Sequence, residues 1–132
     1  LRKMVISVDW KNQQEHINLL QVAARLAHDF INLGFRPVIV VDTFSGDKVN
    51  GFLDALRQLD GSLSIRIVGL YVSDEVLQKR LEARPSDEFK DFGISQKINA
   101  DVLKIRHPCE DQIDTTGLSP EQTAARIYKC II

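Results

Sequence analysis

Two arginines spaced four residues apart are the residues of this chain best suited to bind an anion. Arg80 and Arg84 fall on one predicted helix, where this spacing places both side chains on the same face. A planar guanidinium can donate two parallel hydrogen bonds to phosphate oxygens, so the pair could form an anion clamp. The alternative is a pair of solvated arginines that interact with the nearby carboxylates of Glu82, Asp87 or Glu88.

Two aspartates each follow a short apolar run: residues 4–8 lead to Asp9, and residues 37–41 lead to Asp42. Buried parallel strands would bring such residues to the carboxyl edge of a sheet, where open α/β proteins bind their ligands. Asp9 could be a general base or a partner of a substrate hydroxyl, and it could equally be a turn residue or a helix cap. Four apolar residues before Asp42 resemble the short Walker B pattern, whose aspartate lies near a magnesium ion bound to nucleotide phosphates.

Apolar periodicity predicts the elements that would position these side chains. Continuous apolar runs predict buried strands at 4–8, 37–41 and 65–72, with a short further strand near 113. Apolar stripes at helical spacing predict helices at 13–33, 48–59, 73–84, 94–106 and from 119 onwards. This alternation of strands and helices predicts an α/β fold with a parallel sheet flanked by helices.

The segment 86–108 separates two core elements of this pattern. It opens with the charged sequence SDEFKDFG and continues as an apolar stripe with cations on its other faces. It could form a mobile helical lid over a phosphate site, or a surface helix with one solvated face.

The composition is that of an ordinary single domain. The chain has 132 residues, of which 44% are hydrophobic and 27% charged, with a net charge of −1. This balance gives no indication of nucleic-acid or acidic-membrane binding, and no apolar run is long enough to span a bilayer. Cys109 and Cys130 have no CxxC or metal-ligand spacing, which favours reduced thiols in a cytoplasmic protein.

The ordered set of motifs resembles the small P-loop kinases. These are the nucleoside-monophosphate-kinase-like phosphotransferases, including gluconate-, shikimate- and chloramphenicol-kinase-like proteins. The resemblance covers nearly the whole chain, although no single motif is very specific. It depends on VISVDW, VIVVDTF, LQKRLEARP, the insertion from DEFKDF to RHP, and IDTTGLSPEQTAARI, in this order.

The resemblance implies ATP-dependent phosphoryl transfer to the hydroxyl of a small molecule, in a P-loop NTPase-like fold with a lid at 86–108. Asp9 would act as the base, and Asp42 would lie near Mg²⁺. Arg80 and Arg84 would contact phosphates from the edge of the lid, together with Arg106. The loop formed by Thr115, Thr116 and Gly117 would lie near the adenine.

One expected part of such a kinase does not occur in this sequence. The family opens with a strand, a glycine-rich Walker A loop and a helix, and no GxxxxGK(S/T) is present in the 132 residues. We expect residues 1–132 to be one kinase-like domain whose phosphate loop precedes Leu1 in a parent protein. The alternatives are a degenerate, non-catalytic domain that binds an anion or a protein partner, and a flavodoxin-like binding module.

The role implied for Asp9 can be tested by removing its charge. In a parent kinase, Asp9→Asn is expected to lower turnover by roughly 10²–10⁴-fold, the usual scale for loss of a general base. Nucleotide affinity, measured by titration calorimetry, should change little because the carboxylate would face the acceptor. Near-normal turnover in a folded variant would make Asp9 a turn residue.

Overall fold

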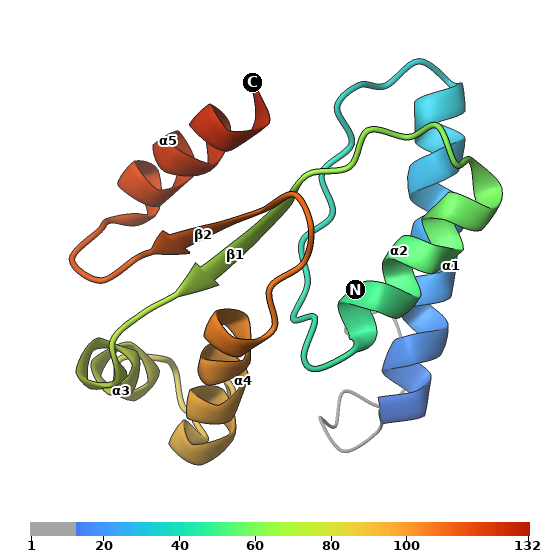
Figure 1. Ribbon diagram of the computed structural model, residues 1–132. Helices are drawn as coiled ribbons and strands as arrows, with labels where there is room; N and C mark the ends of the chain where they lie inside the picture. Colours follow the sequence, from blue (N-terminus) through green and yellow to red (C-terminus); the bar gives the residue numbers. More distant parts are fainter. Residues whose placement is uncertain (1–12) are drawn as a thin grey trace. The chain divides into compact units, whose positions relative to one another are not determined.

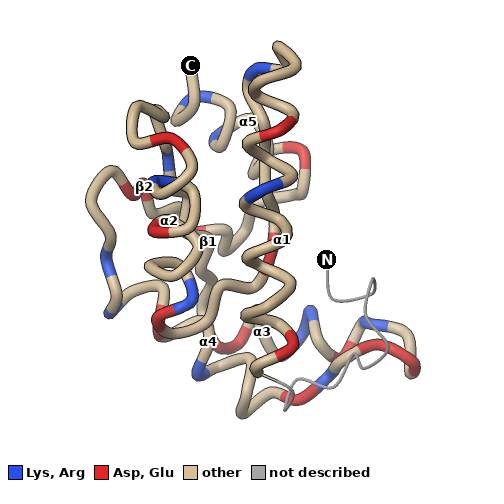
Figure 2. The backbone as a smooth tube through the Cα atoms, turned by 90° about the vertical axis from the view of Figure 1, so that its right-hand side faces the viewer, with Lys and Arg blue, Asp and Glu red and all other residues tan. Residues whose placement is uncertain are grey.

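The computed structural model describes residues 13–132, which contain five helices and two strands. These residues belong to two compact units, Leu1–Ser64 and Ile65–Ile132 (Figure 1). The single domain expected over 1–132 stays a prediction. Lysines and arginines are interspersed with acidic residues along the described chain (Figure 2). None of the described helices is both long enough and apolar enough to cross a membrane.

In the first unit, helix α1 (Gln13–Asn32) packs against helix α2 (Lys48–Leu59), and both confirm the predicted helices (Figure 1). Small side chains on α1 allow the larger side chains of α2 to approach its axis. The buried residues are Leu19, Leu20, Ala23, Ala24 and Ala27 on α1, with Phe52, Leu53 and Leu56 on α2.

A glycine follows the end of helix α1. Gly34 has a φ of +93°, a conformation that is strained for residues with a Cβ atom. The Gly34 amide donates to the Ile31 carbonyl at 3.0 Å, and the Phe35 amide donates to the Phe30 carbonyl at 3.1 Å. These two bonds satisfy carbonyl groups that the end of the helix would leave without partners.

The segment 37–41 was predicted as a strand, but it belongs to neither a helix nor a strand among the described residues. The side chains of Ile39 and Val41 are 67% and 81% exposed. An apolar, β-branched run favours an extended backbone, but a strand also needs a neighbour that accepts and donates its backbone hydrogen bonds. The predicted parallel pairing of 37–41 with 65–72 involves residues of both units and stays a prediction. The strand expected at 4–8 lies outside the described residues.

The second unit contains a two-stranded parallel sheet, which confirms the predicted α/β class. The P-loop NTPase-like fold stays a prediction. Strand β1 (Ile67–Tyr71) lies within the predicted strand 65–72, and strand β2 is Glu110–Asp114. The register pairs Ile67 with Glu110 and Tyr71 with Asp114. Parallel strands require a crossover connection. Here it contains helices α3 (Asp74–Glu82) and α4 (Phe92–Lys104).

Each helix of the second unit begins at a side-chain cap. The Ser73 hydroxyl accepts from an amide of α3, and the Asp91 carboxylate accepts from an amide of α4. Helix α5 (Pro120–Ile131), predicted from 119 onwards, begins with a capping box in which Ser119 and Gln122 cap each other's backbone amides. The apolar stripe predicted a helix from 94, but the cap at Asp91 makes α4 begin two residues earlier, at Phe92.

Helix α4 is attached to the sheet rather than separate from it. The Asn99 side-chain amide donates to the Val72 carbonyl at 2.8 Å, and its oxygen accepts from the Val72 amide at 3.0 Å. A side-chain nitrogen of Gln112 on β2 also donates to the carbonyl of Val102 on α4. Residues 85–91, by contrast, are all exposed. The mobility expected for a lid at 86–108 stays a prediction. Because the contacts above hold α4, we expect the exposed residues 85–91 to be more mobile than the helix.

A glycine on β1 allows α4 and a buried carboxylate to approach the strand. A Cβ atom at Gly69 would lie 2.5 Å from Glu110 Oε1 and 2.9 Å from a methyl carbon of Val102. The Glu110 carboxylate cannot move away freely, because its Oε2 accepts from the His107 amide at 2.7 Å. The close packing at this point therefore requires a residue without a side chain.

Gly69→Ala is expected to lower the free energy of unfolding by about 1–3 kcal/mol, because the added methyl group overpacks this contact. Denaturant unfolding measures the change. Gly51→Ala is the matched control, since the methyl group added on α2 would meet no atom within 4 Å beyond its chain neighbours and the backbone of its own helix. It should stabilise the protein by about 0.5–1 kcal/mol through helix propensity. Equal stability of the two variants would contradict the packing argument.

Candidate functional site

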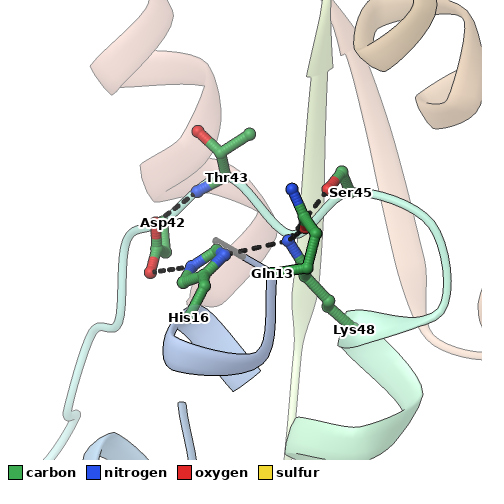
Figure 3. Close-up of polar contacts among 6 residues, drawn as sticks. All are labelled: Gln13, His16, Asp42, Thr43, Ser45 and Lys48. Atoms are coloured by element: carbon green, nitrogen blue, oxygen red, sulfur yellow. Dashed lines mark hydrogen bonds and ion pairs between the residues drawn. The ribbon is translucent and has the colours of Figure 1, made fainter. Parts of the chain in front are cut away.

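The first unit contains a cluster of polar side chains around Asp42, which we call the Asp42 cluster (Gln13, His16, Asp42, Thr43, Ser45 and Lys48; Figure 3). Asp42 directly follows the apolar segment 37–41. Its Oδ2 atom lies 3.0 Å from His16 Nε2, and its Oδ1 accepts from the Thr43 amide at 2.7 Å. The side chains of His16 and Asp42 are only 1% and 9% exposed. Both carboxylate oxygens are therefore held in place in a largely buried environment.

Lys48 approaches the other nitrogen of the same imidazole ring. Its Nζ lies 2.9 Å from His16 Nδ1 and donates to Ser45 Oγ at 3.3 Å and to the side-chain oxygen of Gln13. An ammonium group has only donors, so Nδ1 must act as the acceptor and the ring proton must be on Nε2. The hydrogen bonds therefore run in one direction, from Lys48 to His16 and from His16 to Asp42.

The Asp42 cluster does not fit a magnesium site built from several protein side chains, but it fits one in which phosphates supply most of the ligands. Among residues 13–132, no group of three or more His, Cys, Asp and Glu side chains is arranged to hold a metal. An ionised carboxylate has about four lone-pair positions, so Asp42 keeps acceptor capacity beyond its two hydrogen bonds. Mg²⁺ is commonly bound by one or two carboxylates, with phosphates and waters as its other ligands. Asp42 therefore suits an ion that arrives with phosphates, and its assignment to a metal stays a prediction.

The second unit brings Arg80 together with the loop that follows β2, which we call the 114–118 loop. Arg80 Nη1 donates to Thr115 Oγ1 at 2.9 Å, while Nη2 donates to the carbonyls of Thr115 at 2.8 Å and Leu118 at 3.4 Å. Thr115 is buried, and its amide and hydroxyl both donate to the Tyr71 carbonyl, at 2.8 Å and 3.0 Å. The guanidinium predicted to contact phosphate thus binds protein oxygens and fixes this loop to the end of β1.

Further hydrogen bonds fix the backbone of the 114–118 loop. Thr116 Oγ1 accepts from the Ser73 amide at 2.8 Å, and the Thr116 amide donates to Asp114 Oδ1 at 2.9 Å. Hydrogen bonds from the Thr116 side chain and amide, with a smaller effect of Arg126, lower the pKa of Asp114. The stabilisation from ionised Asp114 is present above its pKa in the unfolded chain, and it is lost as the pH falls through the lowered pKa. Gly117 then turns the chain with a φ of +73°.

Arg84 and Arg106 do not join either cluster. Arg84 lies beyond the end of α3, which ends at Glu82, so the prediction that it shares one helix face with Arg80 is wrong. Pro85 disfavours a helical backbone at the residue before it. Arg84 Nη1 donates to the Phe89 carbonyl at 2.9 Å. Its other guanidinium nitrogens have no hydrogen-bond partner among the described residues. Arg106 is exposed beyond the end of α4, and Asp9 lies outside the described residues. The roles of these three residues stay predictions.

Sequence reasoning singled out only Asp42 of the cluster, and His16 is the buried member that it missed. The only available signal is its position on α1, in register with the buried residues Leu20, Ala23 and Ala27. A polar side chain on a buried helix face needs a hydrogen-bond partner. The sequence does not indicate which one, since His16 and Asp42 are 26 residues apart.

Comparisons with models of protein families, with curated proteins and with solved structures found no match to this chain. The two clusters therefore have to be judged from their own contacts. The Asp42 cluster provides one oriented carboxylate and one nearby ammonium group. The 114–118 loop provides an ordered backbone at the carboxyl ends of two parallel strands, a place where α/β proteins often bind ligands.

Replacing Arg80 and Arg84 in turn by lysine tests the structural role of Arg80. Arg80→Lys is expected to lower the free energy of unfolding by about 1 kcal/mol, because one ammonium group cannot replace three hydrogen bonds to the 114–118 loop. Arg84→Lys is the matched control, since it removes a single exposed bond and should change stability by less than about 0.5 kcal/mol. Equal unfolding free energies in urea would show that Arg80 does not stabilise the loop.

Proposed function

We propose that this chain belongs to an ATP-dependent phosphotransferase that acts on a hydroxyl group of a small molecule, with a P-loop NTPase-like fold. The observation that carries the proposal is the Asp42 carboxylate, which is held by His16 and the Thr43 amide where the apolar segment 37–41 ends. A fixed, largely buried carboxylate after such a segment is what a Walker B aspartate requires. The order of motifs along the chain adds support.

In this proposal the base, the magnesium ligand and the phosphate-binding arginines are different residues. Asp9 is the base that accepts the proton of the substrate hydroxyl, and Asp42 holds Mg²⁺ together with the phosphates of ATP. The ion would neutralise charge on the phosphates. Arg84 and Arg106 bind phosphate oxygens.

The 114–118 loop, with Thr115, Thr116 and Gly117, lies near the adenine in this proposal. Arg80 acts through that loop, because its described partners are all loop oxygens. The proposed location is the cytoplasm, where Cys109 and Cys130, both free, would stay reduced.

A non-catalytic domain that binds an anion or a protein partner is the second candidate. It is favoured by the engagement of Arg80 with protein oxygens and by the lack of a GxxxxGK(S/T) sequence in residues 1–132. The two candidates differ in one measurable property, since only the kinase must bind Mg-ATP productively.

Titration calorimetry with Mg-ATP separates the two candidates. We expect the 132-residue chain to bind Mg-ATP weakly or not at all, because it has no Walker A loop to hold the phosphates. A natural protein that carries such a loop upstream should bind it. If that longer protein also fails to bind Mg-ATP, the kinase proposal is wrong and the non-catalytic candidate remains.

In the longer protein, Arg84→Lys should lower kcat by about tenfold or more while leaving thermal unfolding nearly unchanged. Lysine keeps the charge but loses the bidentate geometry that would stabilise the transferring phosphoryl group. Arg57→Lys is the control, because Arg57 lies on α2 with a side chain that is 58% exposed. An equal, small effect of both variants on kcat would remove Arg84 from the phosphate site.

A further inference from the structure

The imidazole of His16 is the most deeply buried titratable side chain of the Asp42 cluster. The residue is only 2% exposed, although it lies in the first turns of α1. Burial of a polar ring is unfavourable unless its nitrogens are hydrogen-bonded, and both are: Nε2 to Asp42 and Nδ1 to Lys48 (Figure 3). The ring therefore has no nitrogen left for a substrate or a metal, and any effect it has on a ligand must pass through Asp42.

The hydrogen-bond geometry shows which atoms would transmit the effect of His16 to Asp42. Lys48 contacts Nδ1 at 2.9 Å, which holds the ring so that Nε2–H points at Asp42 Oδ2 at 3.0 Å. The Thr43 amide holds the other oxygen, Oδ1, at 2.7 Å. Two donors on different oxygens fix both the position and the rotation of the carboxylate. Only one of the two, His16, is a side chain that a substitution can remove.

We propose that His16 is the positioning residue of Asp42, with Lys48 holding the imidazole in the orientation that this requires. The inference rests on the proposed function, since it assigns to His16 the geometry of the carboxylate that would receive Mg²⁺. Partners that orient a metal-binding carboxylate commonly change metal affinity or activity by 10–100-fold when they are removed. His16 would thus control magnesium binding without contacting the ion.

Two substitutions at this position separate positioning from packing. His16→Gln keeps an amide nitrogen at about the place of Nε2, so it can still donate to Asp42. His16→Leu fills similar space without a donor. His28→Leu is a matched control on the same helix, since the only side-chain partner of His28 among the described residues is Asn32, at 3.4 Å.

The first measurement is independent of any catalytic function. Exchange of the Thr43 amide, followed by NMR, should be faster by roughly fivefold or more in His16→Leu, because a released carboxylate no longer holds this hydrogen bond. It should be close to the natural rate in His16→Gln and in His28→Leu. ¹⁵N spectra of the natural protein should show the His16 proton on Nε2. A proton on Nδ1, or unchanged Thr43 exchange in His16→Leu, would overturn the proposal.

The second measurement is the magnesium dependence of ATP turnover in the full natural protein. The Mg²⁺ concentration at half-saturation should rise about 10–100-fold in His16→Leu and only slightly in His16→Gln. An unchanged magnesium dependence in a folded His16→Leu protein would overturn the proposal. A natural protein without magnesium-dependent turnover would instead refute the proposed kinase. The Thr43 exchange would then still decide whether His16 positions Asp42.

Discussion

The carboxyl end of β1 is the point on which most of the second unit depends. A parallel strand that ends inside a fold leaves backbone groups that need new partners. The Tyr71 carbonyl accepts from both donors of Thr115, and the backbone of Val72 is bonded on both sides by Asn99. The Ser73 amide then donates to Thr116. Three successive residues thus connect β1 to the loop after β2 and to α4, and Ser73 also starts α3.

The helices and β1 could be predicted because each is encoded locally. Apolar spacing and the caps at Ser73, Gly34 and Ser119 lie within a few residues of the elements they define. Strand β2 was harder to predict, because its sequence, EDQID, contains only one apolar residue. Glu110 is tolerated in a buried position there, since its carboxylate accepts from the nearby His107 amide. The segment 37–41 shows the opposite case, in which a strongly strand-like sequence has no strand partner among the described residues.

The candidate site could be predicted only in part, because only some of its residues are marked by a local sequence signal. The position of Asp42 after an apolar run is a local signal, and it indicated a residue that the structure holds rigidly. The spacing of Arg80 and Arg84 predicted one shared helix, but α3 ends at Glu82, so only Arg80 lies on it. Their partners are set by tertiary contacts, however, and these direct Arg80 to the 114–118 loop and Arg84 to the Phe89 carbonyl. His16 has no sequence signal that points to Asp42.

The direction of the hydrogen bonds in the Asp42 cluster also determines its electrostatics. With one ammonium, one neutral imidazole and one carboxylate, the six residues drawn in Figure 3 carry no net charge. Opposite charges so close together produce a field that falls off quickly, so a free cation would feel little attraction until it was near the carboxylate. Any preference of Asp42 for one ion over another must then come from short-range geometry rather than from long-range attraction. The weak long-range attraction would matter little for an ion already bound to phosphates, because the phosphates compensate most of its charge before it reaches Asp42.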